Sequence, residues 1–139
     1  MRISFACLLL LSATVSSMNE PHRKFVTQHI KSEMSENRCD HVIEERGISK
    51  PDSNTCKDTN TFILAKSAEV TKVCGKAGKA YDGGLTKSLQ PFPIVICTLK
   101  TGNNKPKCQY KGRKVTRYIV IRCERKYPVH FAKDVFSLG

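Results

Sequence analysis

Cys56-Lys57-Asp58-Thr59-Asn60-Thr61-Phe62 is the stretch on which the fold of this chain depends. These seven residues bring together a thiol, an amine, an amide, hydroxyls and an aromatic ring. The run continues as Ile63-Leu64, and a short apolar run of this kind is typical of a strand. We therefore expect a loop, fixed at its cysteine, that leads into a strand over Thr61–Leu64.

The first 17 residues have the pattern of a secretory leader. Arg2 precedes an apolar run from Ile3 to Leu11, and the small residues Val15-Ser16-Ser17 follow. A basic start, an apolar run of this length and a small-residue exit predict a signal peptide, and the run is too short to span a bilayer. We expect residues 1–17 to be removed and residues 18–139 to form a single domain of a secreted, extracellular protein.

The chain is strongly basic, with 24 lysines and arginines against 12 acidic residues and a net charge of +12. Loss of Arg2 with the leader leaves 23 basic and 12 acidic residues, a net charge of +11. Such a charge predicts polyanionic partners, namely nucleic acid, heparan-like glycans or anionic membranes. The alternative is a solvated surface that only keeps the protein soluble. The basic residues cluster at 111–117, at 122–126 and at Lys72, Lys76 and Lys79.

Six cysteines remain once Cys7 is removed with the leader: Cys39, Cys56, Cys74, Cys97, Cys108 and Cys123. An even number of cysteines in a small secreted chain predicts a disulfide framework. Six cysteines allow 15 pairings, and their spacing does not choose among these. The chain has no Cys-x-x-Cys pair, which argues against a zinc site, and we expect neither a metal nor another cofactor.

Helical patterns come first along the chain and strand patterns later, which predicts an α+β fold with antiparallel sheet. The expected helices run from Glu20 to about Glu36, over Cys39–Glu45 and over Ala65–Val73. The expected strands after Thr61–Leu64 lie around Ala80-Tyr81 and over Ile94–Leu99, Lys107–Lys111, Val115–Cys123 and Tyr127–Phe131, with a turn at Gly102-Asn103-Asn104.

Two of the four histidines lie in contexts that suit chemistry. His29 lies one helical turn after Phe25, at the edge of an apolar stripe. His130 lies in Val129-His130-Phe131, where strand alternation predicts that its two neighbours face the core and His130 the other side. A lone strand histidine is usually structural, so the interpretation depends on the two occurring together. His22 and His41 match no motif, and we expect both at the surface.

Three segments taken together resemble the pancreatic-type ribonuclease superfamily: Lys24-Phe25-x-x-Gln28-His29, the Cys56–Phe62 stretch and Val129-His130-Phe131. Lys107-Cys108-x-Tyr110 fits as well, and six cysteines with Cys56-Lys57-Asp58 are most similar to the angiogenin-like branch. The resemblance implies a V-shaped fold of three short helices and two antiparallel sheets. It also implies the disulfides Cys39–Cys97, Cys56–Cys108 and Cys74–Cys123, each worth about 4 kcal/mol in the chain-entropy model.

The resemblance assigns His29 as general base, His130 as general acid and Lys57 as the cation of the site. The chemistry suits these residue types, because histidine can take either role near neutral pH and a fixed cation stabilises a phosphorane-like transition state. The remaining substrate-binding residues would be Gln28 and the Phe131 N–H for phosphate oxygens, Thr61 for the pyrimidine edge, Lys24, and Glu124 near a second base.

The sequence thus predicts a secreted endoribonuclease, a monomer, that cleaves RNA on the 3′ side of pyrimidines by transesterification without a metal. A host-defence or angiogenic role would follow from the branch, with an anionic bacterial surface, heparan-like glycans or a cell-surface receptor as further partners. The alternative is a cationic antimicrobial or angiogenic binding protein whose nuclease activity is weak or incidental.

One position departs from the pattern that this superfamily shows. Relatives commonly carry an aspartate two residues after the second histidine, where it hydrogen-bonds that ring, and this chain has Ala132. Strand alternation predicts that positions 130, 132 and 134 share a face, so Asp134 would point to the same side. Lys133 stands where angiogenins carry a residue that obstructs the pyrimidine site, and it would either interfere there or be solvated.

Overall fold

The computed structural model describes residues 19–51, 53–101 and 108–136. The predicted leader, Lys107 and the predicted turn at residues 102–104 lie outside the described residues. In the ranges described, no helix is long and apolar enough to cross a membrane.

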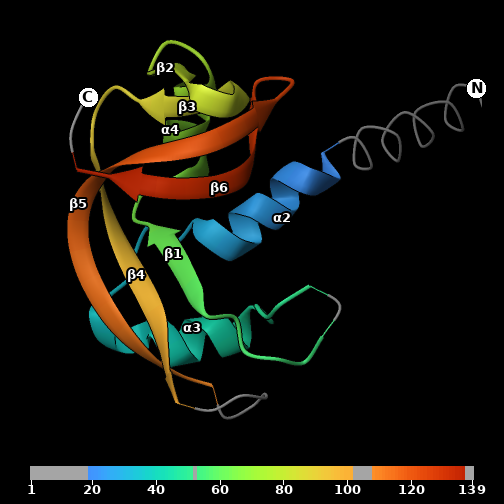
Figure 1. Cartoon of the computed structure of the whole chain (residues 1–139), viewed down its shortest axis with the longest axis vertical. Helices are drawn as coiled ribbons and strands as arrows, with labels where there is room; N and C mark the ends of the chain where they lie inside the picture. The colour runs from blue at the N-terminus through green and yellow to red at the C-terminus, as the bar shows by residue number, and fades with distance from the viewer. Residues whose placement is uncertain (1–18, 52, 102–107, 137–139) are drawn as a thin grey trace, which may run out of the picture.

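Six strands form one antiparallel sheet, and its longest strand belongs to two arms (Figure 1). The first part of β5 pairs with β4, and its later part pairs with β3 on one side and β6 on the other. The two separate sheets that we expected are therefore not confirmed. The strands are β1 (Thr59–Ile63), β2 (Gly78–Tyr81), β3 (Leu85–Ser88), β4 (Phe92–Thr101), β5 (Gln109–Glu124) and β6 (Tyr127–Val135).

The sheet differs from the sequence prediction at β5, which we expected to be two strands. The pairing of β5 with β4 continues through Gly112. The glycine at this position does not mark a break between two strands; it is needed because another segment passes close to it. A Cβ at Gly112 would collide with the backbone carbonyl of Glu36, so the segment carrying Glu36 crosses close over the strand. The strand β3 was also missed, because the glycines before it favoured a loop.

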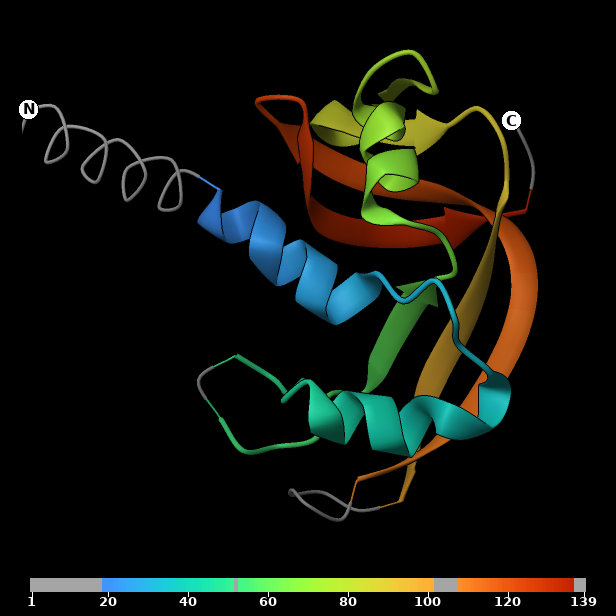
Figure 2. The same cartoon turned by 180° about the vertical axis from the view of Figure 1, so that it is seen from behind.

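Three α-helices and three single turns of 3₁₀-helix accompany the sheet within the described ranges. The α-helices are α2 (Glu20–His29), α3 (Cys39–Glu45) and α4 (Ser67–Thr71), and the 3₁₀ turns are η1 (Glu36–Arg38), η2 (Lys72–Cys74) and η3 (Asp82–Gly84). Figure 2 shows α3 beside β1 and β4, and α4 beside the other arm of the sheet. The predicted bounds of α3 are confirmed.

The first helix ends seven residues earlier than the apolar spacing predicted. Ile30 is extended and forms a bridge with Ile63, and the Lys31 N–H donates to the Ile63 carbonyl at 3.1 Å. The Arg46 side chain donates to the carbonyls of Thr27 (3.0 Å) and Ile30 (2.6 Å). The Arg46 guanidinium thus binds carbonyl groups at the end of the helix, and the residues that follow pair with β1. These tertiary contacts override the apolar spacing that predicted a longer helix.

Strand β1 separates two clusters of buried side chains. Phe62 packs with α3 residues such as Val42, whereas Ile63 packs with Phe25 of α2 and Val70 of α4. Neighbouring residues of a strand face opposite sides, which explains how two adjacent apolar residues serve two cores. The helix α2 therefore sits against β1 and β6, between the arms (Figure 1).

Three disulfides join distant segments, and their pairs are those that the resemblance implies. Cys39–Cys97 joins α3 to β4, Cys56–Cys108 joins the loop before β1 to the segment before β5, and Cys74–Cys123 joins η2 to the end of β5. Two of the three bonds therefore tie the two ends of β5 to other segments, and one of these, the loop before β1, carries Lys57.

Candidate active site

A groove of about 520 Å³ lies between α2, β6 and the segment from Gly47 to Lys57. Its lining includes five residues that the sequence singled out: Lys24, Gln28, His29, Lys57 and His130. They come from three separate parts of the chain. The fold thus gathers two imidazoles, two amines and an amide around one hollow.

His29 is held in one orientation by packing and by a backbone carbonyl. Its side chain is 7% exposed, and its ring centroid lies 5.3 Å from those of both Phe25 and Phe131. The Nδ1–H donates to the carbonyl of Thr61 at 2.9 Å. Because the bond to a carbonyl requires the proton on Nδ1, the neutral ring keeps its lone pair on Nε2.

Burial lowers the pKa of His29 from 6.5 to about 4. The hydrogen bond to the Thr61 carbonyl opposes this shift, while the positive charges of Lys57 and His130 add to it. The histidine is therefore neutral at physiological pH, which is the form that accepts a proton.

Lys57 is joined to the helix of His29 through a buried amide. Its Nζ donates to Oδ1 of Asn60 at 2.9 Å, and Nδ2 of Asn60 donates to the Gln28 carbonyl at 2.9 Å. Asn60 is 1% exposed, so both of its bonds are shielded from water. Burial also lowers the pKa of Lys57. The sequence motifs gave no role to Asn60, although this residue lies within the Cys56–Phe62 stretch.

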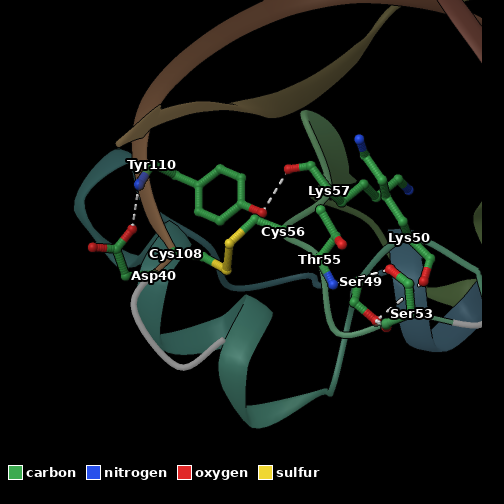
Figure 3. Close-up of a disulfide and its surroundings, with 9 residues drawn as sticks. All are labelled: Asp40, Ser49, Lys50, Ser53, Thr55, Cys56, Lys57, Cys108 and Tyr110. Atoms are coloured by element: carbon green, nitrogen blue, oxygen red, sulfur yellow. Dashed lines mark hydrogen bonds between the residues drawn. A yellow bond between two sulfur atoms is a disulfide. The ribbon is translucent and has the colours of Figure 1, made fainter. Parts of the chain in front are cut away.

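The backbone of Lys57 is fixed from the opposite side by Tyr110 (Figure 3). The Tyr110 hydroxyl donates to the Lys57 carbonyl at 2.6 Å, and the Tyr110 N–H donates to Oδ1 of Asp40 at 2.7 Å. The Cys56–Cys108 disulfide lies beside this pair, one residue before Lys57 (Figure 3). Burial, followed by the charges of Asp40 and Asp58, raises the pKa of Tyr110, so the phenol stays a donor.

His130 lies between two bulges of β6. Arg122 pairs with His130 and Ile121 with Phe131, but the register shifts on both sides of these pairs. Val129 and Ala132 are the extra residues. Bulges re-aim side chains near active sites, and here they leave His130 exposed at the groove while Phe131 packs against the core. Val129 lines the groove and is only half-buried, so its expected place in the core is wrong.

Comparison with known proteins places the chain in one family. The family profile of pancreatic ribonuclease matches residues 20–132. The chain belongs to the pancreatic ribonuclease family. It is 36% identical to ribonuclease-like 3 of zebrafish over 92% of each chain, and 34% identical to mouse angiogenin over 94% of this chain and 90% of that one. The X-ray structure of zebrafish RNase5 matches with a TM-score of 0.81 at 43% identity, covering 83% of this chain and 94% of the other.

The bulge at Ala132 changes what the departure from the family pattern means. Because Ala132 is an extra residue, Asp134 pairs with Ile119 and lies on the face opposite to His130, so the shared face that we expected is wrong. Its Oδ2 instead lies 3.6 Å from Nε of Arg117. Asp134 therefore does not replace the family's aspartate.

The remaining sequence candidates have separate positions. Thr61 is 5% exposed and adjoins His29 through its carbonyl. Glu124 lies outside the groove, in a neighbouring hollow of about 490 Å³ that shares Val129 with it. Lys133 points to β2, where its Nζ lies 5.1 Å from the centre of the Tyr81 ring. This contact directs the lysine toward β2, the outer strand of its arm of the sheet.

The two histidines outside the family motifs differ from each other. His41 is exposed on α3, as expected, with Nε2 3.7 Å from Glu45. His22 is half-buried, and its Nδ1–H donates to the Pro128 carbonyl at 2.9 Å while its ring lies 4.9 Å from that of Tyr127. His22 is therefore only partly exposed at the surface, because its ring joins the start of α2 to β6.

Proposed function

We propose that this chain is an endoribonuclease that cleaves RNA on the 3′ side of pyrimidines by transesterification, with His29 as base, His130 as acid and Lys57 as the stabilising cation. The observation that carries the proposal is the state of His29. Its ring is neutral, its Nδ1–H is occupied by a carbonyl, and it shares a groove with a second histidine and a lysine.

The chemistry requires no metal ion. Nε2 of His29 removes the proton from the ribose 2′-hydroxyl, and the 2′-oxygen attacks phosphorus. The 5′-oxygen leaves with a proton from His130, which gives a 2′,3′-cyclic phosphate and a free 5′-hydroxyl. Lys57 stabilises the extra negative charge that develops on the phosphate oxygens, and Gln28 and the Phe131 N–H would bind those oxygens.

Base selection is assigned to Thr61 and Phe131. The Thr61 hydroxyl both donates and accepts, so it can match the edge of a pyrimidine, and the Phe131 ring lies against His29 nearby. Lys24 in the groove would hold a further phosphate, and Glu124 would accept a hydrogen bond from the base that follows the cleaved bond. The hollow containing Glu124 adjoins the groove on the side of His130, which is the leaving-group side.

Secretion is part of the proposal. A leader over residues 1–17 would direct the chain to an oxidising compartment, where three disulfides form and persist. The partner would be RNA met outside the cell or after uptake, and the enzyme would act as a monomer.

The test is cleavage of a uridine-containing dinucleotide by wild type, His29→Ala and His130→Ala. Each substitution should lower the rate by ~10²–10⁴-fold, the scale of a general acid or base. The exposed residue His41, changed to Ala, is the matched control and should leave the rate unchanged. Wild-type rates in either site variant, with the fold intact by circular dichroism, would remove that histidine from the mechanism.

A second candidate is a cationic binding protein with incidental nuclease activity. Lys111, Arg113 and Lys114 favour it, because they are exposed on β5 in the arm that pairs with β4, and none of them lines the groove. Bacterial killing that survives His130→Ala but is lost when these residues are changed to Gln would support binding as the main activity. Killing that is lost with RNA cleavage would support the nuclease.

A further inference from the structure

The end of α2 is held by side chains that come from other segments of the chain. The last carbonyls of a helix have no partner within the helix itself. Nη1 of Arg46 donates to the carbonyls of Thr27 at 3.0 Å and of Ile30 at 2.6 Å. The Gln28 carbonyl between them accepts a bond from Nδ2 of Asn60 at 2.9 Å. The turn that carries the proposed base is therefore bonded to the end of α3 and to the start of β1.

The backbone of Arg46 is itself fixed, because α3 ends there in a Schellman motif. The Gly47 N–H donates to the Glu44 carbonyl at 3.0 Å, and the Ile48 N–H donates to the Ile43 carbonyl at 3.0 Å. Gly47 has a φ of 65°, the left-handed conformation that this motif requires. Ile43 and Ile48 are both buried in the same core cluster. The Arg46 side chain therefore extends from a rigid point toward α2.

The guanidinium of Arg46 suits the end of a helix in charge as well as in geometry. A guanidinium is always protonated and has no acceptor, and the C-terminal end of a helix carries a partial negative charge. Arg46 is half-buried, and it lines a hollow of about 580 Å³ together with Thr27 and Gln28. It is not among the residues that line the groove of the two histidines. Its contacts are thus with the helix backbone and not with the site itself.

The position of the His29 ring depends on where this turn lies. The backbone of His29 belongs to α2, whereas its Nδ1–H donates to the Thr61 carbonyl of β1. Its ring lies between those of Phe25 and Phe131. A displacement of the last turn would lengthen the bond to Thr61 or withdraw the ring from the two phenylalanines, and water would then reach it. Burial is the largest cause of the low pKa of His29, so this pKa reports whether the turn is in place.

We propose that Arg46 is a positioning residue for RNA cleavage: by bonding to carbonyls at the end of α2, it keeps the His29 ring buried with Nε2 available in the groove. The inference rests on the proposed function, because His29 is the base named there. Arg46 acts through the helix backbone, so its loss should impair the chemical step and not the binding of substrate. Two other roles are open to the test, namely a contribution to stability alone and an attraction of RNA by charge.

The experiment compares Arg46→Met, which removes the donor and the charge but keeps an unbranched apolar stem, with a matched control. The control is Arg23→Met, because Arg23 is exposed on α2, lines the same hollow and forms its ion pair with Glu20. Cleavage of the uridine-containing dinucleotide gives kcat and KM as a function of pH. An NMR titration of the His29 ring protons, assigned with His29→Gln, gives the pKa without any RNA. Arg46→Lys, whose side chain is one bond shorter, is the milder variant and decides the question if Arg46→Met does not fold.

Arg46→Met should lower kcat about tenfold with little change in KM, the consequence of a displaced catalytic group. The pKa of His29 should rise from about 4 toward 6.5, and the acid limb of the kcat/KM profile should move with it. Arg23→Met should match the wild type in all of these. An unchanged kcat or an unchanged pKa in Arg46→Met would make Arg46 a residue of stability only, and an equal effect of Arg23→Met would show that only charge counts; each result overturns the proposal. A wild type that does not cleave the dinucleotide would overturn the proposed function, and the titration would still show whether Arg46 holds the ring.

Discussion

The buried, neutral state of His29 predicts a pH dependence of folding stability that one substitution should remove. The pKa of His29 is about 4 in the folded protein against 6.5 for a free histidine. Between these values the unfolded chain binds a proton that the folded protein does not. Stability therefore falls as the pH is lowered from 6.5 to about 4, and the loss levels off below that.

The size of the effect follows from the shift. Each unit of pKa difference corresponds to 1.36 kcal/mol, so lowering the pH across the whole interval should cost the wild type about 3 kcal/mol through this one residue. Above pH 6.5 the ring is neutral in both states and contributes no pH dependence. His29→Gln removes the titrating group, so the variant should lack this component of the pH dependence.

The assay is urea unfolding at several values between pH 4 and pH 7, with disulfides intact. Carboxylates also titrate here, but they do so in both proteins, so the difference between wild type and His29→Gln isolates the histidine. His41→Gln, which removes an exposed histidine, is the control and should follow the wild type. A constant difference between wild type and His29→Gln across the interval would refute the argument, because it would mean that the folded protein binds the proton as readily as the unfolded chain.

Three further predictions concern single side chains around the groove. Lys57→Ala should lower kcat/KM for RNA cleavage by about 10²-fold, the cost of one preorganised donor, with little change in KM; a large rise in KM at constant kcat would make Lys57 a docking charge only. Tyr110→Phe should lower the free energy of unfolding by about 1 kcal/mol, because the Lys57 carbonyl loses its donor, and urea unfolding measures this; wild-type stability would show that water replaces the hydroxyl. Ala132→Asp should raise kcat/KM by about tenfold or less if the bulge lets the new carboxylate reach His130, and an unchanged rate at several pH values would show that its absence does not limit the site.

The sequence predicted the parts of the site that depend on local pattern. His29 and Lys57 lie in short motifs whose helix and strand are fixed by neighbouring apolar residues, and they lie where the motifs implied. The helix α3 was also predicted with its observed bounds, because its apolar spacing and the glycine that follows it indicate the same helix end. Local and tertiary preferences coincide in these segments.

The features that the sequence did not predict depend on pairing between distant segments. The early end of α2 results from the bridge between Ile30 and Ile63. No sequence pattern near Ile30 predicts this bridge. The bulges at Val129 and Ala132 are visible only once β6 is aligned with β5. An alternation rule applied to β6 alone put Asp134 on the wrong face, because one extra residue reverses every side chain beyond it.

The different surroundings of the two histidines support their assignment to different roles. When two titratable groups share a site, environments that push their proton affinities apart indicate which is the base and which the acid. His29 is enclosed between two phenylalanine rings and is kept neutral by burial, so it is ready to accept a proton. His130 is exposed on a strand whose bulges hold it at the groove, which is the position that the proposed mechanism requires of the acid. Exchanging the roles would require the buried ring to carry a charge in the resting enzyme, and the free-energy cost of that charge is the same one that the unfolding experiment measures.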